Sequence, residues 1–394
     1  MKLNDENLLA AHLISIADGV YEETAARIGE IGTDTVADAV LKEIAWRADH
    51  NAPPSQPVTA VFELTHEGKQ LDYLMTLGAD APAIGPGALA DPWLVVRQDL
   101  VELLRAVYGP PDAVIGTRAI ALKDEPGPGS FAPDDPWRLA RDAAAVAADR
   151  IITACRPYPY DLNALSLQFG SDKWGGHWYT QQYAEHFAAL RDSRVRVLEL
   201  GIGGYQAPTA GGASLRMWKQ YFRRGMVYGL DYFDKSGIAE PRLQPLQGDQ
   251  GDASFLHELG SSLGPFDIIV DDGSHISSDV LTSFQALLPY LRPGGLYVVE
   301  DTQTSYWSGW GGSSTGTDDP ATSIGYLKTL VDALHHQEFE KDSGRADGAF
   351  DGWIGALHFY HNIVVIEKRR SVEQSAPSWV PRHTNPMEWM KPKE

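Results

Sequence analysis

The amino-acid sequence predicts an α/β fold with a parallel sheet in its C-terminal part, preceded by a separate α+β domain. Two observations support this prediction. From Arg194 onward, short β-rich runs alternate with segments of helical spacing, which is typical of strand–helix–strand units with right-handed crossovers. Before residue 155, helical segments and a strand pair occur without this alternation. We therefore expect two domains, residues 1–155 and residues 156–394.

The predicted N-terminal domain begins with helices, because apolar side chains in residues 5–48 recur at helical spacing. Residues 58–65 and 69–77 predict a strand pair around a turn at Gly68. The other expected elements are two helices, at residues 91–109 with Asp91 as the cap and at residues 137–154. This domain carries no motif of known chemistry.

The predicted C-terminal domain contains five strands with helices between them. The expected strands are residues 194–201, 226–233, 243–249, 266–273 and 296–302. The expected helices are residues 214–222, 252–263 and 278–291, and residues 356–368 predict a closing strand pair. In an open α/β sheet, ligands bind at the carboxyl ends of the strands, so the residues that follow each strand are the candidates for a site.

The composition restricts the class of function. The formal net charge of −20 repels a phosphate backbone, so no nucleic-acid partner is expected. The single cysteine, Cys155, cannot form an internal disulfide. Asp5 and Glu6 stand where a signal peptide carries positive charge, and no apolar run reaches the ~18 residues of a membrane span. We therefore expect a cytoplasmic enzyme without a membrane partner.

Three successive strand ends carry residues that suit a nucleotide-like cofactor. The first combines Glu199 with Gly201 and Gly203, and glycines here let a ligand approach the backbone. Asp231 ends the second strand and is placed to accept from ribose hydroxyls, and Asp249 follows the third and is placed to bind an adenine amino group. An ordinary tight turn also explains the glycines alone. The order of the three signals favours a dinucleotide or S-adenosylmethionine (SAM) site, and G-x-G-x-x-G, the usual nicotinamide motif, is absent here.

Acidic residues follow the fourth and fifth strands. Asp271 and Asp272 end the fourth, and Glu300 and Asp301 end the fifth. Because these strands are expected to be neighbours, Asp272, Glu300 and Asp301 converge at one edge of the predicted sheet. Clustered carboxylates repel one another unless a cation neutralises them, and carboxylate oxygens suit Mg²⁺ or Mn²⁺ rather than zinc. The alternative is a set of separate, solvated loop acids.

His275 lies three residues after Asp272, at the start of the following helix. A neutral imidazole beside a metal site can accept the proton of an alcohol, which makes His275 the candidate general base. The alternative is a structural histidine at a helix start.

The motifs DDGSH, VVEDT, LRPGG, GGASLRMWK and LQGDQGD resemble those of the macrolide sugar O-methyltransferases, of the mycinamicin VI and demethylmacrocin type. The resemblance extends over about residues 160–390. It implies a Rossmann-like class I SAM methyltransferase fold with an N-terminal auxiliary domain. It also implies SAM and Mg²⁺ as cofactors, a homotetramer, and a deoxysugar hydroxyl of a glycosylated polyketide as the acceptor.

Carried over residue by residue, the resemblance implies metal ligands at Asp272, Glu300 and Asp301 and a catalytic base at His275. The predicted cofactor contacts are Glu199, Gly201, Gly203, Asp231, Asp249 and Asp271. The candidates for an acceptor pocket are Trp174, His177, Trp178, Tyr179, Tyr306, Trp307 and Trp310. The segment from Thr302 is expected to be either a mobile lid or an interface loop.

Three alternatives remain open at this point. One is a Mg²⁺-dependent O-methyltransferase that acts on a catechol or another vicinal diol, with the same metal site. The second is a cephalosporin-type tailoring protein. The third is a binding module without enzymatic activity.

Overall fold

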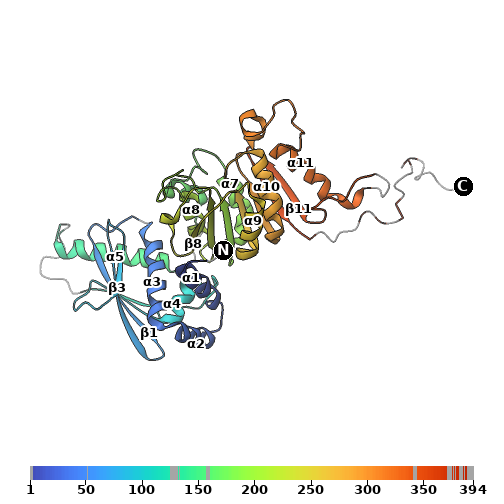
Figure 1. Ribbon diagram of the computed structural model, residues 1–394. Helices are drawn as coiled ribbons and strands as arrows, with labels where there is room; N and C mark the ends of the chain where they lie inside the picture. The colour runs from blue at the N-terminus through green and yellow to red at the C-terminus, as the bar shows by residue number, and fades with distance from the viewer. Residues whose placement is uncertain are drawn as a thin grey trace. The chain divides into compact units, whose positions relative to one another are not determined.

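The computed structural model describes residues 3–50, 52–124, 132, 134–156, 160–339, 344–370, 375, 377, 379, 380, 385 and 387 (Figure 1). The helices are α1 (Asp5–Ile16), α2 (Tyr21–Ile31), α3 (Thr33–Asp49), α4 (Leu100–Tyr108), α5 (Pro136–Ala154), α6 (Leu162–Phe169), α7 (Thr180–Phe187), α8 (Ala213–Tyr221), α9 (Ala253–Leu263), α10 (Ser277–Leu287) and α11 (Ser323–Leu334). The strands are β1 (Val58–His66), β2 (Lys69–Leu77), β3 (Ala83–Pro86), β4 (Leu94–Asp99), β5 (Ala119–Leu122), β6 (Arg196–Leu200), β7 (Met226–Asp231), β8 (Leu243–Gln247), β9 (Phe266–Asp271), β10 (Leu291–Val299), β11 (Ile354–Tyr360) and β12 (Ile363–Lys368). Within the described ranges, no helix combines the length and the apolar character that crossing a membrane requires.

The N-terminal strands form a five-stranded sheet in the order β3-β2-β1-β4-β5. Strand β1 pairs antiparallel with β2 across the predicted turn, from Val58 opposite Leu77 to His66 opposite Lys69. It also pairs in parallel with β4. The predicted strand pair is therefore confirmed. Helices α1, α2 and α3 account for the helical spacing of residues 5–48.

Residues 91–109 are not the single helix that the sequence predicted. They form strand β4 and then helix α4, whose cap is Asp99 rather than Asp91. The Asp99 side chain accepts a hydrogen bond from the backbone N–H of Glu102 at 3.1 Å. A short apolar run fits a buried strand as well as a helical turn. Here Val95 lies opposite Val61 of β1, so pairing with another segment determines the local structure.

The C-terminal strands form a seven-stranded sheet in the order β11-β12-β10-β9-β6-β7-β8. Strands β9 and β10 run parallel, as do β7 and β8, whereas β12 pairs antiparallel with β10 and with β11. The predicted parallel sheet with a closing strand pair is confirmed. The strand order reverses between β6 and β9, which is where open α/β sheets bind ligands. Every residue of β9 is buried, as expected for a central strand covered on both faces.

The chain packs into two compact units. One comprises residues 198–201 and 248–394, and the other comprises residues 2–197 and 202–247. The second unit therefore includes the N-terminal helices together with α8, β7 and β8. The domain boundary that we expect near residue 155 rests on the change of sequence pattern there. It stays a prediction.

A buried ion network within this second unit joins α3 to the connection between β7 and β8. Glu43 Oε1 accepts from Arg47 Nε at 2.7 Å and from Arg242 Nη2 at 2.6 Å, and all three side chains are buried. Burial by itself raises the pKa of Glu43, but the guanidinium groups of Arg242 and Arg47 outweigh burial and hold this pKa below its usual range. The N-terminal helices thus share their packing with the strand connection that begins after Asp231.

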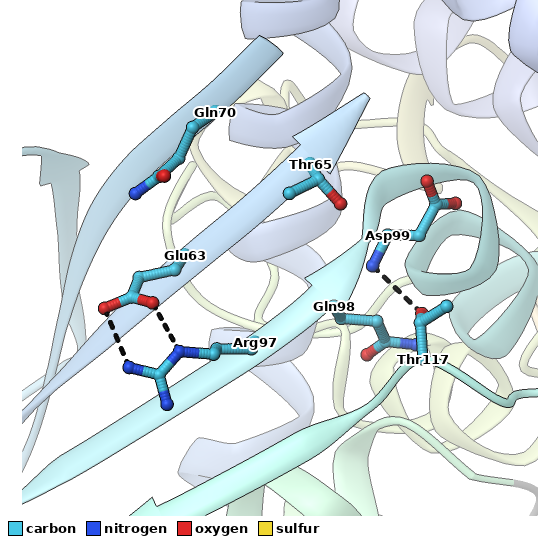
Figure 2. A pocket seen from close by; sticks show the side chains of 7 residues that line it. All are labelled: Glu63, Thr65, Gln70, Arg97, Gln98, Asp99 and Thr117. Carbon is cyan, nitrogen blue, oxygen red and sulfur yellow. Dashed lines mark hydrogen bonds and ion pairs between the residues drawn. The ribbon is translucent and has the colours of Figure 1, made fainter. Parts of the chain in front are cut away.

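A polar hollow of about 260 Å³ lies on the N-terminal sheet (Figure 2). It is lined by Glu63, Thr65, Gln70, Arg97, Gln98, Asp99 and Thr117. Its charged groups are satisfied from within the chain. Arg97 donates to both carboxylate oxygens of Glu63, at 2.6 and 3.3 Å, and Asp99 Oδ2 accepts from the Tyr21 hydroxyl at 2.9 Å. We assign no chemistry to this hollow.

Candidate metal and cofactor site

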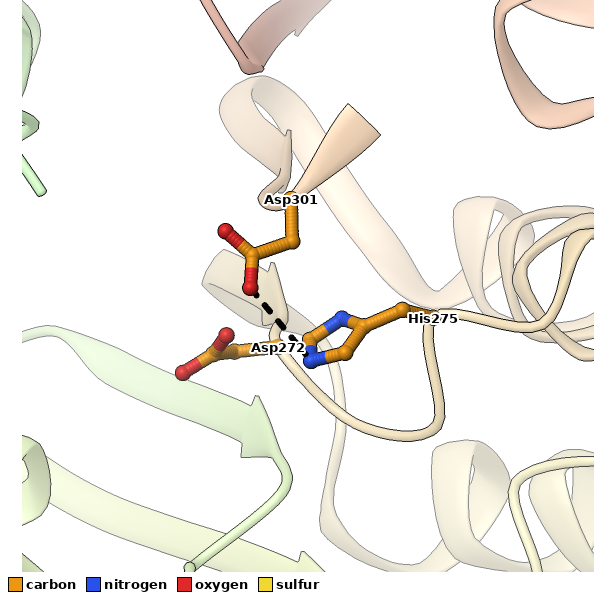
Figure 3. Close-up of side chains that lie close together, drawn as sticks. All are labelled: Asp272, His275 and Asp301. Atoms are coloured by element: carbon orange, nitrogen blue, oxygen red, sulfur yellow. Dashed lines mark ion pairs between the residues drawn. The ribbon is translucent and has the colours of Figure 1, made fainter. Parts of the chain in front are cut away.

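Three side chains that suit a metal gather at the carboxyl ends of β9 and β10 (Figure 3). Asp272 directly follows β9, Asp301 lies just beyond β10, and His275 lies in the loop between β9 and α10. One ligand atom from each lies within 4.8 Å of the others, and His275 Nε2 is 3.6 Å from Asp301 Oδ2. The parallel pairing of β9 with β10 places Asp271 opposite Val299, which brings both strand ends to one edge. The convergence expected of Asp272 and Asp301 is therefore present.

The spacing of these atoms fits a single divalent cation. Two ligands of one Mg²⁺, each at about 2.1 Å, lie at most about 4.2 Å apart, so the three atoms, which lie within 4.8 Å of one another, need only a small side-chain movement to reach one cation. The Asp272 and Asp301 carboxylates are hard oxygen ligands, which Mg²⁺ prefers over imidazole. The donor set therefore fits a metal held by the two aspartates, with His275 beside it.

Glu300 is placed differently from its neighbour Asp301. Its side chain is buried, and among the residues that the structure describes it does not belong to the three-residue group. Successive side chains of an extended strand point to opposite faces, and Asp301 then leaves the strand with a φ of +50°. Its role as a third metal ligand stays a prediction.

Two residues of the group adopt a backbone conformation that L-residues rarely take. His275 has a φ of +56° and Asp301 has a φ of +50°. Such left-handed residues other than glycine cost free energy and persist where the surrounding structure demands them, often at functional sites. Both occur in the segments that follow β9 and β10, where the candidate metal side chains lie.

The cofactor candidates of the same unit are Glu199, Gly201, Asp249 and Asp271. Glu199 is buried on β6, and Asp249 is exposed and accepts from the Gly251 backbone N–H at 2.7 Å. A Cβ at Gly201 would lie 2.1 Å from the Asp272 carbonyl oxygen, so only glycine lets these strand ends approach.

Asp271 is buried inside the same unit. Burial raises its pKa to about 6, although hydrogen bonds from Ser283 and Gln250 oppose this rise. Its carboxylate accepts from Gln250, Ser283 and Tyr297. Its predicted cofactor contact stays a prediction.

The other two cofactor candidates, Gly203 and Asp231, lie in the second unit. Gly203 has a φ of +75°, and outside its two chain neighbours no heavy atom of another residue lies within 4 Å of the position that a Cβ would take. Space for a ligand is therefore left beside its backbone. Asp231 Oδ2 accepts from the backbone N–H of Ile202 at 3.0 Å, and Oδ1 accepts from that of Phe233 at 2.9 Å. Asp231 thus orders the start of the glycine loop, which we define as residues 202–212.

Lys235 holds this glycine loop, and the sequence analysis missed it. Its side chain is buried, and Nζ donates to the carbonyl oxygens of Ala207 at 3.0 Å and Ala210 at 3.3 Å. The loop is closed by the Gly212 N–H, which donates to the Ile202 carbonyl at 2.8 Å. Lys235 comes four residues after Asp231, so one strand connection both positions that acid and shapes the loop that carries Gly203. No charge pattern in the sequence indicates a lysine bonded to carbonyls.

Replacing Lys235 with methionine is expected to raise the KM for SAM by about 10- to 100-fold, because hydrogen bonds to a charged group contribute about 1.5–3 kcal/mol. The turnover number should change far less, since the metal and base candidates lie in the other unit. Steady-state kinetics and calorimetry with S-adenosylhomocysteine measure both effects. Lys368→Met is the matched control, because this buried lysine also donates to backbone carbonyls, those of Leu288, Pro289 and Leu291. An equal rise in the KM for SAM in both variants would contradict the role of Lys235 in shaping the glycine loop for SAM.

Exposed aromatic side chains lie in the segment that follows β10 and Asp301. Tyr306, Trp307 and Trp310 each expose more than a third of their surface, and the Trp310 ring centroid lies 6.3 Å from that of His275. Tyr306 ends the 3-10 helix η4 (Thr302–Tyr306), Trp310 ends the 3-10 helix η5 (Ser308–Trp310), and Trp307 lies between the two. Backbone hydrogen bonds tie this segment internally, including Ser313 N–H to the Ser305 carbonyl at 2.9 Å. These aromatics are thus presented on an ordered segment beside the candidate base.

The other aromatic candidates lie in the second unit and pack against one another. Trp174 and Trp178 are edge to face at 4.6 Å, and His177 stacks on Tyr179 at 4.7 Å. Trp178 is 60% exposed, so it remains available to a ligand. Their acceptor role stays a prediction.

Two family models match the chain. The model described as "MycE methyltransferase N-terminal" matches residues 10–118, and the model described as "Methyltransferase domain" matches residues 208–302. The second match includes the DDGSH loop and the end of β10.

Characterised relatives match nearly the full length. The chain is 43% identical to an 8-demethyl-8-alpha-L-rhamnosyl tetracenomycin-C 2'-O-methyltransferase of Streptomyces olivaceus, over 93% of this chain and 96% of that protein. It is 41% identical to a demethylmacrocin O-methyltransferase of Streptomyces fradiae, over 97% and 96%. A solved structure of the MycE methyltransferase from the mycinamycin pathway, in complex with Mg, SAH and mycinamycin VI, superposes with a TM-score of 0.84 at 36% identity and covers 97% of each chain.

Proposed function

This chain belongs to the family of sugar O-methyltransferases that act on glycosylated polyketides, and from that premise we propose that it methylates a deoxysugar hydroxyl of such a compound. SAM is the methyl donor and Mg²⁺ the metal in this proposal. The observation that carries it is the group of Asp272, His275 and Asp301 at the ends of two parallel strands. A methyltransferase that binds its acceptor through a metal needs carboxylates and a base in this arrangement.

The metal would be held by Asp272 and Asp301, with Glu300 as the predicted third ligand. Mg²⁺ bound there supplies Lewis-acid activation of an acceptor hydroxyl, and adjacent hydroxyls on one sugar ring suit such a site. The two aspartates would position this charge at the strand ends. The solved structure of the MycE methyltransferase in complex with Mg, SAH and mycinamycin VI supports the same metal and cofactor here.

His275 would accept the hydroxyl proton at Nε2, the ring nitrogen that faces Asp301. The Asp301 carboxylate, 3.6 Å away, then stabilises the imidazolium. SAM would supply the methyl group, which would pass from the sulfonium sulfur to the acceptor oxygen. The products are the methyl ether, S-adenosylhomocysteine and a proton on His275.

The cofactor residues have separate tasks in this proposal. Asp231 would bind the ribose hydroxyls and Asp249 the adenine, while Gly203 leaves room beside its backbone. Glu199 and Gly201 complete the predicted contacts. The homotetramer implied by the resemblance is also part of the proposal.

A methyl-transfer assay with a rhamnosylated polyketide, its aglycone and a catechol tests the acceptor class. We expect methylation of the glycoside alone, detected by mass spectrometry, with loss of activity when EDTA removes the metal and recovery when Mg²⁺ is added back. Full activity in EDTA, or a catechol methylated as efficiently as the glycoside, would overturn the proposal.

A further inference from the structure

The loop from Asp272 to His275 carries two of the three grouped side chains, and its shape depends on a residue outside it. We propose that Gln250 is a positioning residue that holds this loop in the conformation required for metal binding and proton transfer. The inference rests on the function proposed above, and it concerns how the site is built rather than which acceptor it takes. Gln250 lies in the QGDQGD segment after β8, next to Asp249.

The Gln250 amide bridges two groups of opposite hydrogen-bonding character. Its Oε1 accepts from the backbone N–H of Ser274 at 2.7 Å, and its Nε2 donates to Asp271 Oδ1 at 2.8 Å. A backbone N–H only donates and a carboxylate only accepts, so these partners determine the amide orientation. A primary amide supplies both functions from one side chain, whereas a carboxylate or an apolar chain of similar length cannot.

The far end of this bridge is rigid. Asp271 is buried at the end of β9, and its Oδ2 accepts from the Ser283 hydroxyl of α10. The Tyr297 hydroxyl of β10 lies 3.5 Å from the same oxygen. Gln250 therefore connects the loop to a side chain that three neighbouring elements hold in place.

The near end of the bridge lies directly against the loop backbone. A Cβ at Gly273 would lie 2.0 Å from Gln250 Oε1, so a side chain at this position would displace the Gln250 amide. Ser274 is also held by its hydroxyl, which donates to Asp279 Oδ2 at 2.8 Å. The backbone N–H of Asp272 donates to the Leu200 carbonyl at 3.0 Å. These contacts anchor the loop just before His275, which then adopts its left-handed conformation.

Replacing Gln250 with methionine keeps the length of the side chain and removes both hydrogen bonds. We expect kcat to fall and the dissociation constant of Mn²⁺, used as the probe metal, to rise, each by about 10- to 100-fold, as is typical when a partner of metal-site residues is removed. The KM for SAM should change far less than the Mn²⁺ affinity, because loss of the bridge releases the Ser274 backbone of the metal loop, whereas Asp271 keeps its hydrogen bonds from Ser283 and Tyr297. Electron paramagnetic resonance of free Mn²⁺ measures the affinity without any turnover.

Gln98→Met is the matched control. Gln98 is also buried, and its amide oxygen accepts a hydrogen bond from Arg118 Nε at 2.8 Å, but it lies on β4 of the N-terminal sheet. This variant should keep the wild-type Mn²⁺ affinity and kcat. Gln250→Asn retains the amide and shortens its reach, so it should repeat the loss if the methionine variant does not fold.

Wild-type Mn²⁺ affinity together with wild-type kcat in Gln250→Met or Gln250→Asn would overturn the inference. A rise in the KM for SAM that accounts for the whole loss, with unchanged Mn²⁺ affinity, would do so as well. If the wild-type protein binds Mn²⁺ but methylates no glycoside, the proposed function fails, while the effect of Gln250 on metal affinity still decides this inference.

Discussion

Replacing His275 with asparagine is expected to lower kcat by about 10²- to 10⁴-fold, the usual contribution of a positioned general base. The deprotonation of the acceptor hydroxyl then has to proceed without the imidazole that lies 3.6 Å from Asp301. Asparagine is the informative choice, because His275 has a φ of +56° and asparagine tolerates that conformation better than alanine does. The variant therefore removes the base with the least disturbance of the loop.

Single-turnover kinetics with saturating SAM, Mg²⁺ and glycoside measure this loss directly. The KM for SAM and the affinity for Mn²⁺ should stay close to wild type, since the carboxylates remain in place. His257→Ala is a suitable control, because His257 is an exposed residue of α9 that packs on Tyr290. Turnover of His275→Asn equal to that of the control would show that another group accepts the proton.

Replacing Asp301 with asparagine is expected to weaken Mg²⁺ binding by about 10²- to 10³-fold, because the change removes the negative charge of one proposed ligand and leaves a neutral amide oxygen in its place. Asparagine again tolerates the left-handed backbone, here with a φ of +50°. Asp272→Asn should act in the same direction. Both variants should lose activity at low Mg²⁺ and regain part of it as Mg²⁺ is raised.

Thermal unfolding gives a second measurement of the metal site. A cation that binds only the folded protein stabilises it by about 2.7 kcal/mol at a concentration of one hundred times its Kd. Mg²⁺ should therefore raise the Tm of the wild-type protein and of Asp332→Asn, an exposed control on α11. At the same concentration it should have little effect on Asp301→Asn. Equal Tm shifts in all three proteins would show that the cation binds elsewhere.

The sheet of the C-terminal part could be predicted because each of its strands has an apolar pattern that is visible within its own few residues. FDIIVD is mostly apolar, with Ile268, Ile269 and Val270 in succession, which is typical of a strand buried on both faces, and it forms β9 as expected. Residues 91–109 show the limit of this approach. Their apolar run fits both a helix and a strand, and the first part becomes strand β4 only because it pairs with β1.

The sequence by itself determined which chemistry is available and roughly where. Acids directly after two neighbouring parallel strands must meet at one edge, so the approach of Asp272 to Asp301 follows from strand order alone. The tertiary structure decided what holds them there. Gln250 reaches Ser274, 24 residues along the chain, and Lys235 reaches Ala207 at a distance of 28 residues. Such contacts join segments that are remote in sequence through one donor and one acceptor, and they leave no local pattern of hydrophobicity or charge. They exist only once the sheet has brought the strand ends together.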